Sequence, residues 1–302
     1  MRRVAWRDRE ARPVIGERTM RWLIALARRV PLRWGYGLAE AIGRLAAWLF
    51  PKRRAILESN LAAVLGAGER RRLRRMATEI FAHALRSYYE LLRLPALPLE
   101  EVLCRVVFEE PGWTQFREAY RQGKGVIVVG PHQSSFDLAG YTVIAQGFPL
   151  CVFTLPDEAG FGSLNELRAL SGARVLPAGP AAVREALRAL RRGEVVVLAA
   201  DRPTRGQGTV VEFFGRPTLL PDGHVRLALH TGAPVFLAFV HREGERYRVR
   251  FQPLEIIRTG NEAEDVRRNV QRTAQATEPG IRAHPEQWHL FLRLWEEEPR
   301  GD

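Results

Sequence analysis

The sequence predicts an α/β protein, in which a largely parallel central sheet is flanked by helices and preceded by an N-terminal helical segment. From about residue 99 onward, short runs of β-branched and other apolar residues alternate with amphipathic stretches, as expected for a parallel sheet covered on both faces. The run from Val126 to Val129 is unbroken, which is typical of a strand buried on both faces. Before residue 99 only helical periodicity occurs. We therefore expect a helical segment at 1–98 and an α/β unit at 99–302.

The α/β part contains regularly spaced candidate elements. The expected strands are 125–130, 150–155, 173–176, 194–200 and 234–240, and a candidate edge strand lies at 246–251. The expected helices are 113–122, 136–146, 161–171, 180–192, 221–232 and 263–283, followed by an aromatic tail at 288–295.

The N-terminal part contains three helical stretches, at 32–50, 52–66 and 69–94. In the first, apolar residues including two tryptophans recur at three- and four-residue steps, and Pro51 ends the helix. Two interpretations are open for this helix. It packs on the body of the protein, or it lies in the plane of a membrane interface, to which tryptophans and flanking basic residues are suited.

The positive charge is concentrated in the first part of the chain. The formal net charge is +12, and residues 1–90 carry 20 Lys and Arg against 8 Asp and Glu, whereas 91–302 carry 26 of each kind. A basic segment on a neutral body indicates an anionic partner, either a membrane surface or a nucleic acid. No helix-turn-helix, RNP or zinc pattern accompanies the arginines at 70–75, so we expect a membrane and no nucleic acid.

The two cysteines, Cys104 and Cys151, have no metal-ligand spacing, and both are expected to be buried thiols. With no disulfide framework, a reducing cytoplasmic setting is expected. The sequence contains neither a recognisable signal peptide nor an apolar run approaching about 18 residues. These features predict a soluble or peripheral protein.

The strand at 125–130 leads into a turn that carries titratable groups. Gly130 and Pro131 end the strand, and Ser134 and Ser135 are suitable N-cap residues for the next helix. His132 and Asp137 therefore lie at a strand-to-helix turn, where α/β proteins place their chemistry. An acid-base site and a simple helix cap with an acid in the first turn both fit this spacing.

Three further stretches carry candidate site residues. Arg168 precedes a turn and strand, whereas Asp201 and Arg202 follow the strand at 194–200, at the sheet edge where His132 lies. A local ion pair is the alternative for Asp201 and Arg202. For Glu212 the alternative to substrate binding is a solvent-facing strand residue.

These stretches together resemble the lysophospholipid acyltransferase superfamily, in particular the late acyltransferases of lipid A biosynthesis and the phosphatidylinositol mannoside acyltransferases. The resemblance extends from about residue 53 to the C-terminal helices, and the order and spacing of its motifs carry it. The motifs are Arg53-Arg54-Ala55-Ile56-Leu57-Glu58-Ser59-Asn60-Leu61, Gly123-Lys124-Gly125-Val126, His132 with Asp137, Ala200-Asp201-Arg202-Pro203, Phe213-Phe214-Gly215 with Pro217, and Thr231-Gly232-Ala233-Pro234-Val235.

The resemblance implies an O-acyltransferase whose HX4D motif is His132 and Asp137. His132 would take the proton of a hydroxyl as general base, and Asp137 would fix the tautomer of its ring. Arg168 and Arg202 match positions near substrate phosphates. Arg202 stands where the lipid A enzymes commonly have Gln, and Ser134-Ser135-Phe136-Asp137 replaces their Gly-Asn-Trp-Glu, so the lipid A acceptor does not follow.

The expected substrates are an acyl thioester, either acyl-CoA or acyl-carrier protein, and a membrane lipid acceptor at the cytoplasmic face of the plasma membrane. No metal or cofactor is expected. Ser135, Asp201 and Glu212 complete the expected substrate-binding residues, and backbone N–H groups near Ser135, or Arg168 or Arg202, would stabilise the oxyanion. A lysophospholipid acceptor and a hydrolase of thioesters or esters stay open as alternatives, although no Gly-x-Ser-x-Gly elbow is present.

Overall fold

A computed structural model of the protein describes residues 22, 25–27, 29–66, 68–155, 162–203 and 208–295. Its centre is a seven-stranded sheet in the order β1-β9-β8-β2-β5-β3-β4, in which only the pair β8–β9 is antiparallel. The predicted fold class is confirmed. The strands of this sheet are β1 (Val106–Phe108), β2 (Val126–Gly130), β3 (Leu150–Thr154), β4 (Arg174–Pro177), β5 (Val195–Ala199), β8 (Val235–Glu243) and β9 (Arg246–Leu254).

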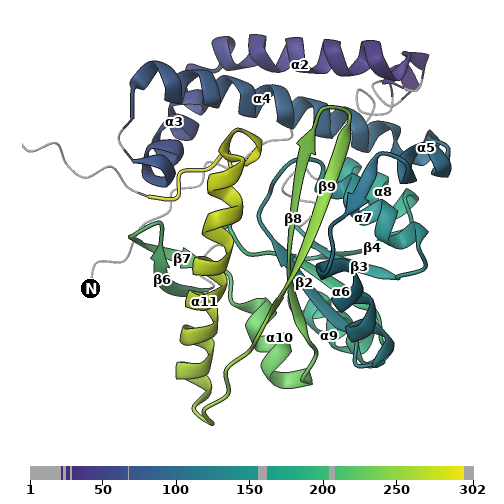
Figure 1. The fold of residues 1–302 in the computed structure, drawn as a ribbon, viewed down its shortest axis with the longest axis vertical. Helices are drawn as coiled ribbons and strands as arrows, with labels where there is room; N and C mark the ends of the chain where they lie inside the picture. Colours follow the sequence, from purple (N-terminus) through teal and green to yellow (C-terminus); the bar gives the residue numbers. More distant parts are fainter. Residues whose placement is uncertain are drawn as a thin grey trace, which may run out of the picture.

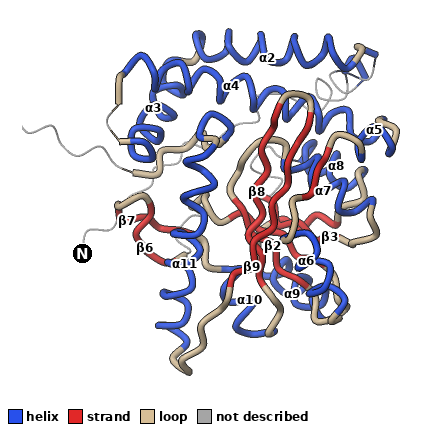
Figure 2. The backbone as a smooth tube through the Cα atoms, in the orientation of Figure 1, coloured by secondary structure: helices blue, strands red, loops and turns tan. Residues whose placement is uncertain are grey.

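Helices cover both faces of the sheet (Figures 1 and 2). They are α6 (Gly112–Arg121), α7 (Phe136–Ala145), α8 (Gly162–Leu170), α9 (Pro180–Arg191) and α10 (Gly223–Thr231). Strand β2 shows how the layers form, because its side chains alternate between the two faces. Val126 and Val128 pack in the core with α6, α7 and α8, whereas Ile127 and Val129 pack in the core with α9 and α10. This burial on both faces explains the unbroken β-branched run.

Some predicted details differ from the structure. Strand β9 was expected at an edge, which is wrong, because the three-residue β1 pairs with it in parallel. A run this short carries no periodic signal. The hairpin of β6 (Thr209–Phe213) and β7 (Arg216–Leu220) was also not predicted. Its turn has positive φ at Phe214 and Gly215. Such two-residue turns usually have the sequence Asn-Gly, and here phenylalanine stands in place of the asparagine, so the sequence did not indicate a hairpin.

The N-terminal helices α2 (Leu32–Leu49), α3 (Pro51–Leu65) and α4 (Arg70–Arg93) lie over one end of the sheet, with α4 between α2 and the strands (Figure 1). A 3-10 turn (Leu94–Ala96) and the short helix α5 (Leu99–Leu103) connect them to β1. Helix α2 contacts α4 through buried small residues four positions apart, Gly35, Ala39, Gly43 and Ala47. At Gly43 an added Cβ would lie 2.6 Å from the carbonyl oxygen of Phe81, so only glycine permits this close crossing. One face of α2 is therefore packed on the body of the protein.

The opposite face of α2 is apolar and exposed. Its large side chains include Trp34, which is 73% exposed, and Trp48, which is 69% exposed. Leu38, Ile42, Leu45 and Leu49 lie between or beside them and are also exposed. The packing interpretation is confirmed for one face of this helix, and the membrane interpretation stays a prediction for the other. No helix in the described ranges is long and apolar enough to cross a membrane.

The C-terminal part closes the fold beside the sheet. Helix α11 (Glu262–Ala283) packs against the β6–β7 hairpin, and a core cluster joins both to the aromatic tail. The helix is capped by Asn261, whose side chain accepts from the Glu264 N–H. Among the cysteines, Cys151 is buried as predicted. The expectation for Cys104 is wrong, because this residue follows the end of α5 and is exposed.

The buried His224 on α10 makes the stability of the fold depend on pH. Burial lowers its pKa to about 4, outweighing the opposing charge of Asp222. Its Nε2 lies 2.9 Å from Oγ1 of Thr273, whereas Nδ1 has no hydrogen-bond partner among the described residues. A second proton on the ring would therefore have no acceptor.

We expect the free energy of unfolding to fall as the pH drops from about 6.5 towards about 4. In this window the unfolded chain binds a proton that the folded His224 does not bind, so at about pH 5 this residue alone removes about 2 kcal/mol of stability. Urea unfolding at about pH 7.5 and about pH 5 measures the loss, which should be smaller in His224→Gln than in the wild type. Equal losses in both proteins would contradict the assignment.

Candidate active site

The predicted catalytic turn lies at the carboxyl end of β2, on the side of the sheet that α4 and α2 cover (Figure 1). Strand β5 is the parallel neighbour of β2, with Gly130 opposite Ala199. His132 and Asp201 each follow one of these strand ends, so the two side chains meet at the same edge. At Gly130 an added Cβ would lie 2.3 Å from the carbonyl oxygen of Ala238, so glycine permits β8 to approach closely just before the turn.

The imidazole of His132 is hydrogen-bonded to Asp201. The Nδ1 atom lies 2.7 Å from Oδ1 of Asp201, and the backbone N–H of His132 donates to Oδ2 over 2.9 Å. An ionised carboxylate only accepts hydrogen bonds, so Nδ1 carries the ring proton and Nε2 holds the free lone pair. The His132 side chain is 26% exposed, whereas that of Asp201 is fully buried. The pair is built as a base that a substrate can reach.

Asp201 is ionised despite its burial. Burial by itself raises the pKa of its carboxyl group, but the charge and hydrogen bond of His132, the indole N–H of Trp288 and the backbone N–H of His132 outweigh this effect and lower the pKa. The charged donors and dipoles replace the water that burial removes. A buried anion beside the imidazole favours the protonated ring that forms when the base takes a proton.

Asp137 occupies a different place from the one predicted. The His132 ring is held by Asp201 and not by Asp137. Both carboxylate oxygens of Asp137 instead accept hydrogen bonds from Arg168 of α8, one from Nε over 2.7 Å and one from Nη2 over 3.1 Å. Asp137 lies in the first turn of α7, which directs its side chain towards α8. The Arg168 guanidinium also lies 5.9 Å from the centroid of the Phe136 ring. The two residues of the HX4D motif therefore have separate partners, Asp201 for His132 and Arg168 for Asp137.

Arg168 and Arg202 belong to one electrostatic cluster. Burial raises the pKa of Tyr88 on α4, and the nearby charges of Arg168, Asp137 and Arg202 modify this shift. Arg202 directly follows Asp201, so the structure places both predicted basic residues beside the turn. Both guanidinium groups are therefore near the predicted catalytic turn, and that of Arg168 is ion-paired with Asp137.

Ser135 holds the turn to α4. It is the N-cap residue of α7 as predicted, but its hydroxyl makes no capping hydrogen bond. The hydroxyl instead donates to Glu90 and contacts the Ser87 hydroxyl at 3.1 Å. Glu90 is 1% exposed and also accepts from Tyr247 and Arg105. Ser135 is therefore a fixed link between the helices over the sheet edge and the turn between His132 and Asp137.

Glu212 lies away from these residues, on the exposed side of β6. Its backbone N–H and carbonyl both pair with the side chain of Gln271 on α11, each over 2.8 Å. No hydrogen bond or ion pair within the described ranges joins Glu212 to His132, Asp201, Asp137 or Arg168. The role of Glu212 in substrate binding stays a prediction, and its position away from the His132 turn does not support it.

The C-terminal tail supplies one residue of the candidate site, Trp288, that the sequence did not predict. The indole N–H of Trp288 donates to Oδ2 of Asp201 over 2.7 Å, and Gln133 forms a β-bridge with Trp288. The only signal in the sequence was the aromatic run at 288–295, which predicts burial but no partner.

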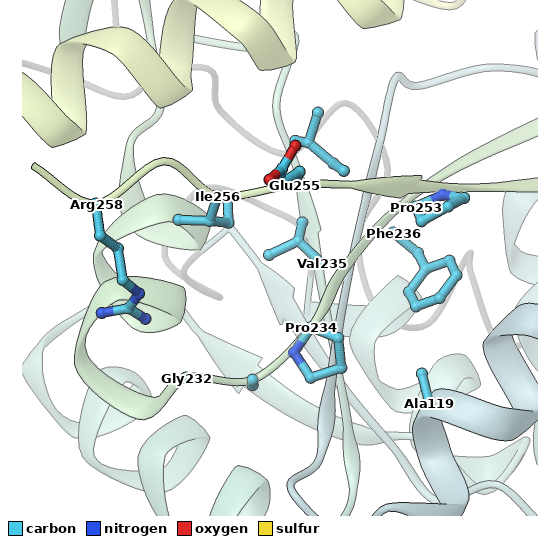
Figure 3. Close-up of a pocket in the computed structure, with 11 residues that line it drawn as sticks. Ala119, Gly232, Pro234, Val235, Phe236, Pro253, Glu255, Ile256 and Arg258 are labelled. Atoms are coloured by element: carbon cyan, nitrogen blue, oxygen red, sulfur yellow. The ribbon is translucent and has the colours of Figure 1, made fainter.

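A depression of about 470 Å³ lies at the opposite edge of the sheet, at the amino end of β8 (Figure 3). Pro234, Val235, Pro253 and Ile256 line it, with Arg258 at one side. Arg258 donates to the last carbonyls of α10. This depression is therefore separate from His132. Within the described residues, no three or more His, Cys, Asp or Glu side chains are grouped to hold a metal ion.

Comparison with known proteins identifies the chain. A family model described as bacterial lipid A biosynthesis acyltransferase matches residues 19–297. The phosphatidylinositol mannoside acyltransferase of Mycobacterium tuberculosis is 30% identical over 251 residues, covering 79% of this chain and 76% of the relative. That of Mycolicibacterium smegmatis is 27% identical over 304 residues, covering 90% of this chain and 95% of the relative.

A largely parallel α/β sheet with an accessible histidine at its carboxyl edge, together with these matches, defines an acyltransferase. The chain belongs to the family of bacterial lipid A biosynthesis acyltransferases, and the two mycobacterial phosphatidylinositol mannoside acyltransferases are among the proteins to which it is similar.

Proposed function

We propose that this acyltransferase moves a fatty acyl group from an acyl thioester, acyl-CoA or acyl-carrier protein, to a hydroxyl of a membrane glycolipid. The contact between Nδ1 of His132 and Asp201 carries the proposal, because it leaves Nε2 as a proton acceptor on an accessible ring. A lipid hydroxyl is a poor nucleophile until such a base takes its proton. The mycobacterial relatives are phosphatidylinositol mannoside acyltransferases, which favours a mannosylated phosphatidylinositol as acceptor.

The reaction needs no side-chain nucleophile. Nε2 of His132 takes the hydroxyl proton as the oxygen attacks the thioester carbonyl, and the C–O bond forms. The tetrahedral oxyanion then collapses, the C–S bond breaks, and the imidazolium returns the proton to the departing thiolate. Asp201 stabilises the imidazolium throughout. The first N–H groups of α7 lie next to this turn and are suited to stabilise the oxyanion.

Arg168 and Arg202 are proposed to bind substrate phosphate. Asp137 holds Arg168 by two parallel hydrogen bonds, which fix the plane of the guanidinium. Asp137 thus acts in the site through Arg168.

Labelled acyl-CoA and acyl-carrier protein, each incubated with a panel of membrane lipids, test the proposal by mass spectrometry. An acylated mannolipid is the expected product. An acylated lysophospholipid would change the acceptor, whereas free fatty acid alone with every lipid would indicate a hydrolase and contradict acyl transfer.

We further propose that the enzyme works as a peripheral protein at the cytoplasmic face of the plasma membrane. The exposed apolar face of α2 lies on the side of the molecule where the catalytic edge lies (Figure 1). Arg70, Arg71, Arg72, Arg74 and Arg75 at the start of α4 are also exposed. Basic residues near an anionic membrane contribute about 1 kcal/mol each, and salt weakens that attraction.

Replacing Trp34 and Trp48 with serine should reduce binding to anionic vesicles and leave the fold intact. Both side chains are largely exposed, and α2 keeps its small-residue contact with α4. Vesicle flotation beside circular dichroism measures binding and folding together. The matched control is Val183→Ser on α9, an exposed apolar residue outside the apolar face of α2. Unfolding of the double variant, or unchanged flotation in low and high salt, would contradict the membrane assignment.

A further inference from the structure

The C-terminal segment 284–295 holds the catalytic turn by its backbone. The N–H of Ser134 donates to the carbonyl of Gln287 over 2.8 Å, and the N–H of His289 donates to the carbonyl of His132 over 2.7 Å. Between these bonds Gln133 and Trp288 form an antiparallel bridge. The turn that carries the base is therefore paired with a chain segment about 150 residues away in sequence.

Within this segment Trp288 reaches the site with its side chain. Its indole N–H donates to Oδ2 of Asp201 over 2.7 Å, the same oxygen that accepts from the backbone N–H of His132. Two N–H groups thus fix Oδ2, and Oδ1 is directed at Nδ1 of the ring. Trp288 is 1% exposed, and its indole packs in the core cluster beside Phe214, with the two ring centroids 6.3 Å apart.

We propose that Trp288 is a positioning residue of the active site, whose indole N–H holds the Asp201 carboxylate in the orientation that supports His132. The proposal rests on the proposed function. The indole N–H of Trp288 acts on His132 through Asp201. Its aromatic rings are fixed by the core, so the direction of the N–H is set before any substrate binds.

The electrostatics of Asp201 agree with this geometry. Against the effect of burial, the Trp288 hydrogen bond is among the contacts that lower the pKa of its carboxyl group. Without the indole N–H, Oδ2 keeps only the backbone donor and the carboxylate gains freedom to rotate. More of its negative charge then faces the imidazole, so the protonated form of the ring becomes more favourable.

Trp288→Phe keeps most of the ring and removes the N–H. We expect kcat to fall about tenfold, in line with the loss of one hydrogen bond to a charged group, with little change in KM for either substrate. We also expect the acid limb of the pH–rate profile to move to higher pH by about half a unit to one unit. The downfield proton resonance of the His132–Asp201 hydrogen bond should shift as well, and this readout requires no substrate.

The matched control is Trp295→Phe. The indole N–H of Trp295 donates to Oγ1 of Thr218 over 2.7 Å, and this residue is buried in the same core cluster but bonds outside the site. The control should lose comparable stability and keep the wild-type acid limb and proton resonance. If Trp288→Phe and Trp295→Phe both keep the wild-type acid limb of the pH–rate profile and the wild-type proton resonance, the proposal is overturned.

If Trp288→Phe does not fold, replacing Trp288 by benzothienylalanine, which has the indole shape without the N–H, is expected to give the same shifts.

Two other histidines, His289 and His83, lie near the His132 imidazole or near each other. Burial lowers their pKa values to about 3 and about 4, so both stay neutral across the acid limb.

Failure of the proposed function is distinguishable from failure of this inference. If the wild type transfers no acyl group to any lipid, the proton resonance still reports whether Trp288 holds Asp201. If transfer occurs and neither readout responds to loss of the N–H, only the role of Trp288 is lost.

Discussion

His132→Ala is expected to lower turnover by roughly 10²–10⁴-fold, the usual range for loss of a general base. Nε2 of this ring is the proton acceptor that the Asp201 contact leaves free, and alanine offers none. The side chain is 26% exposed and lies at a turn, so its removal leaves the core intact. The measurement is the rate of lipid acylation at saturating donor and acceptor, with circular dichroism to establish folding.

His230→Ala is the matched control, because this histidine is exposed on α10, near the opposite edge of the sheet. It should keep the wild-type rate. The residual activity of His132→Ala should also lose the acid limb that the imidazole imposes. Near-wild-type transfer by folded His132→Ala would end the proposed mechanism.

Asp201→Asn is expected to lower turnover by about 10³–10⁴-fold, because it leaves the ring in the wrong tautomer. The two N–H groups at Oδ2, from His132 and Trp288, will hold the amide oxygen of the asparagine. Its NH2 group must then face Nδ1, which can only accept. The ring proton moves to Nε2, and the atom that should take the substrate proton no longer can.

Asp137→Asn is the comparison for this prediction. It breaks the bidentate pair with Arg168 and leaves a guanidinium whose side chain is only 14% exposed without its charge partner. We expect lower thermal stability and a higher KM for the phosphate-bearing substrate, with a smaller fall in kcat than Asp201→Asn causes. If kcat instead falls more in Asp137→Asn than in Asp201→Asn, and only Asp137→Asn alters the acid limb of the pH–rate profile, Asp137 is the partner of the His132 ring.

The sequence by itself determined most of the helices and strands and where the candidate site residues fall along the chain. Strand and helix periods are local properties, so β2, β5 and α9 were predicted to within about two residues of their observed ends. The α/β alternation then places every residue that follows a parallel strand at one edge of the sheet. His132, Asp201 and Arg202 were candidates for that reason, and the family follows from the order of their motifs.

Tertiary structure alone decided which groups meet at that edge. His132 and Asp137 are five positions apart, yet the ring contacts Asp201, 69 positions away, and Trp288 contacts Asp201 across 87 positions. Proximity in sequence favoured Asp137, but the first turn of α7 directs that carboxylate to Arg168. The strand order that joins β2 to β5, and the tail that returns over the turn, are set by packing of distant segments. Periodicity reports only which face of an element is buried, and the partner on that face is fixed when the whole core forms.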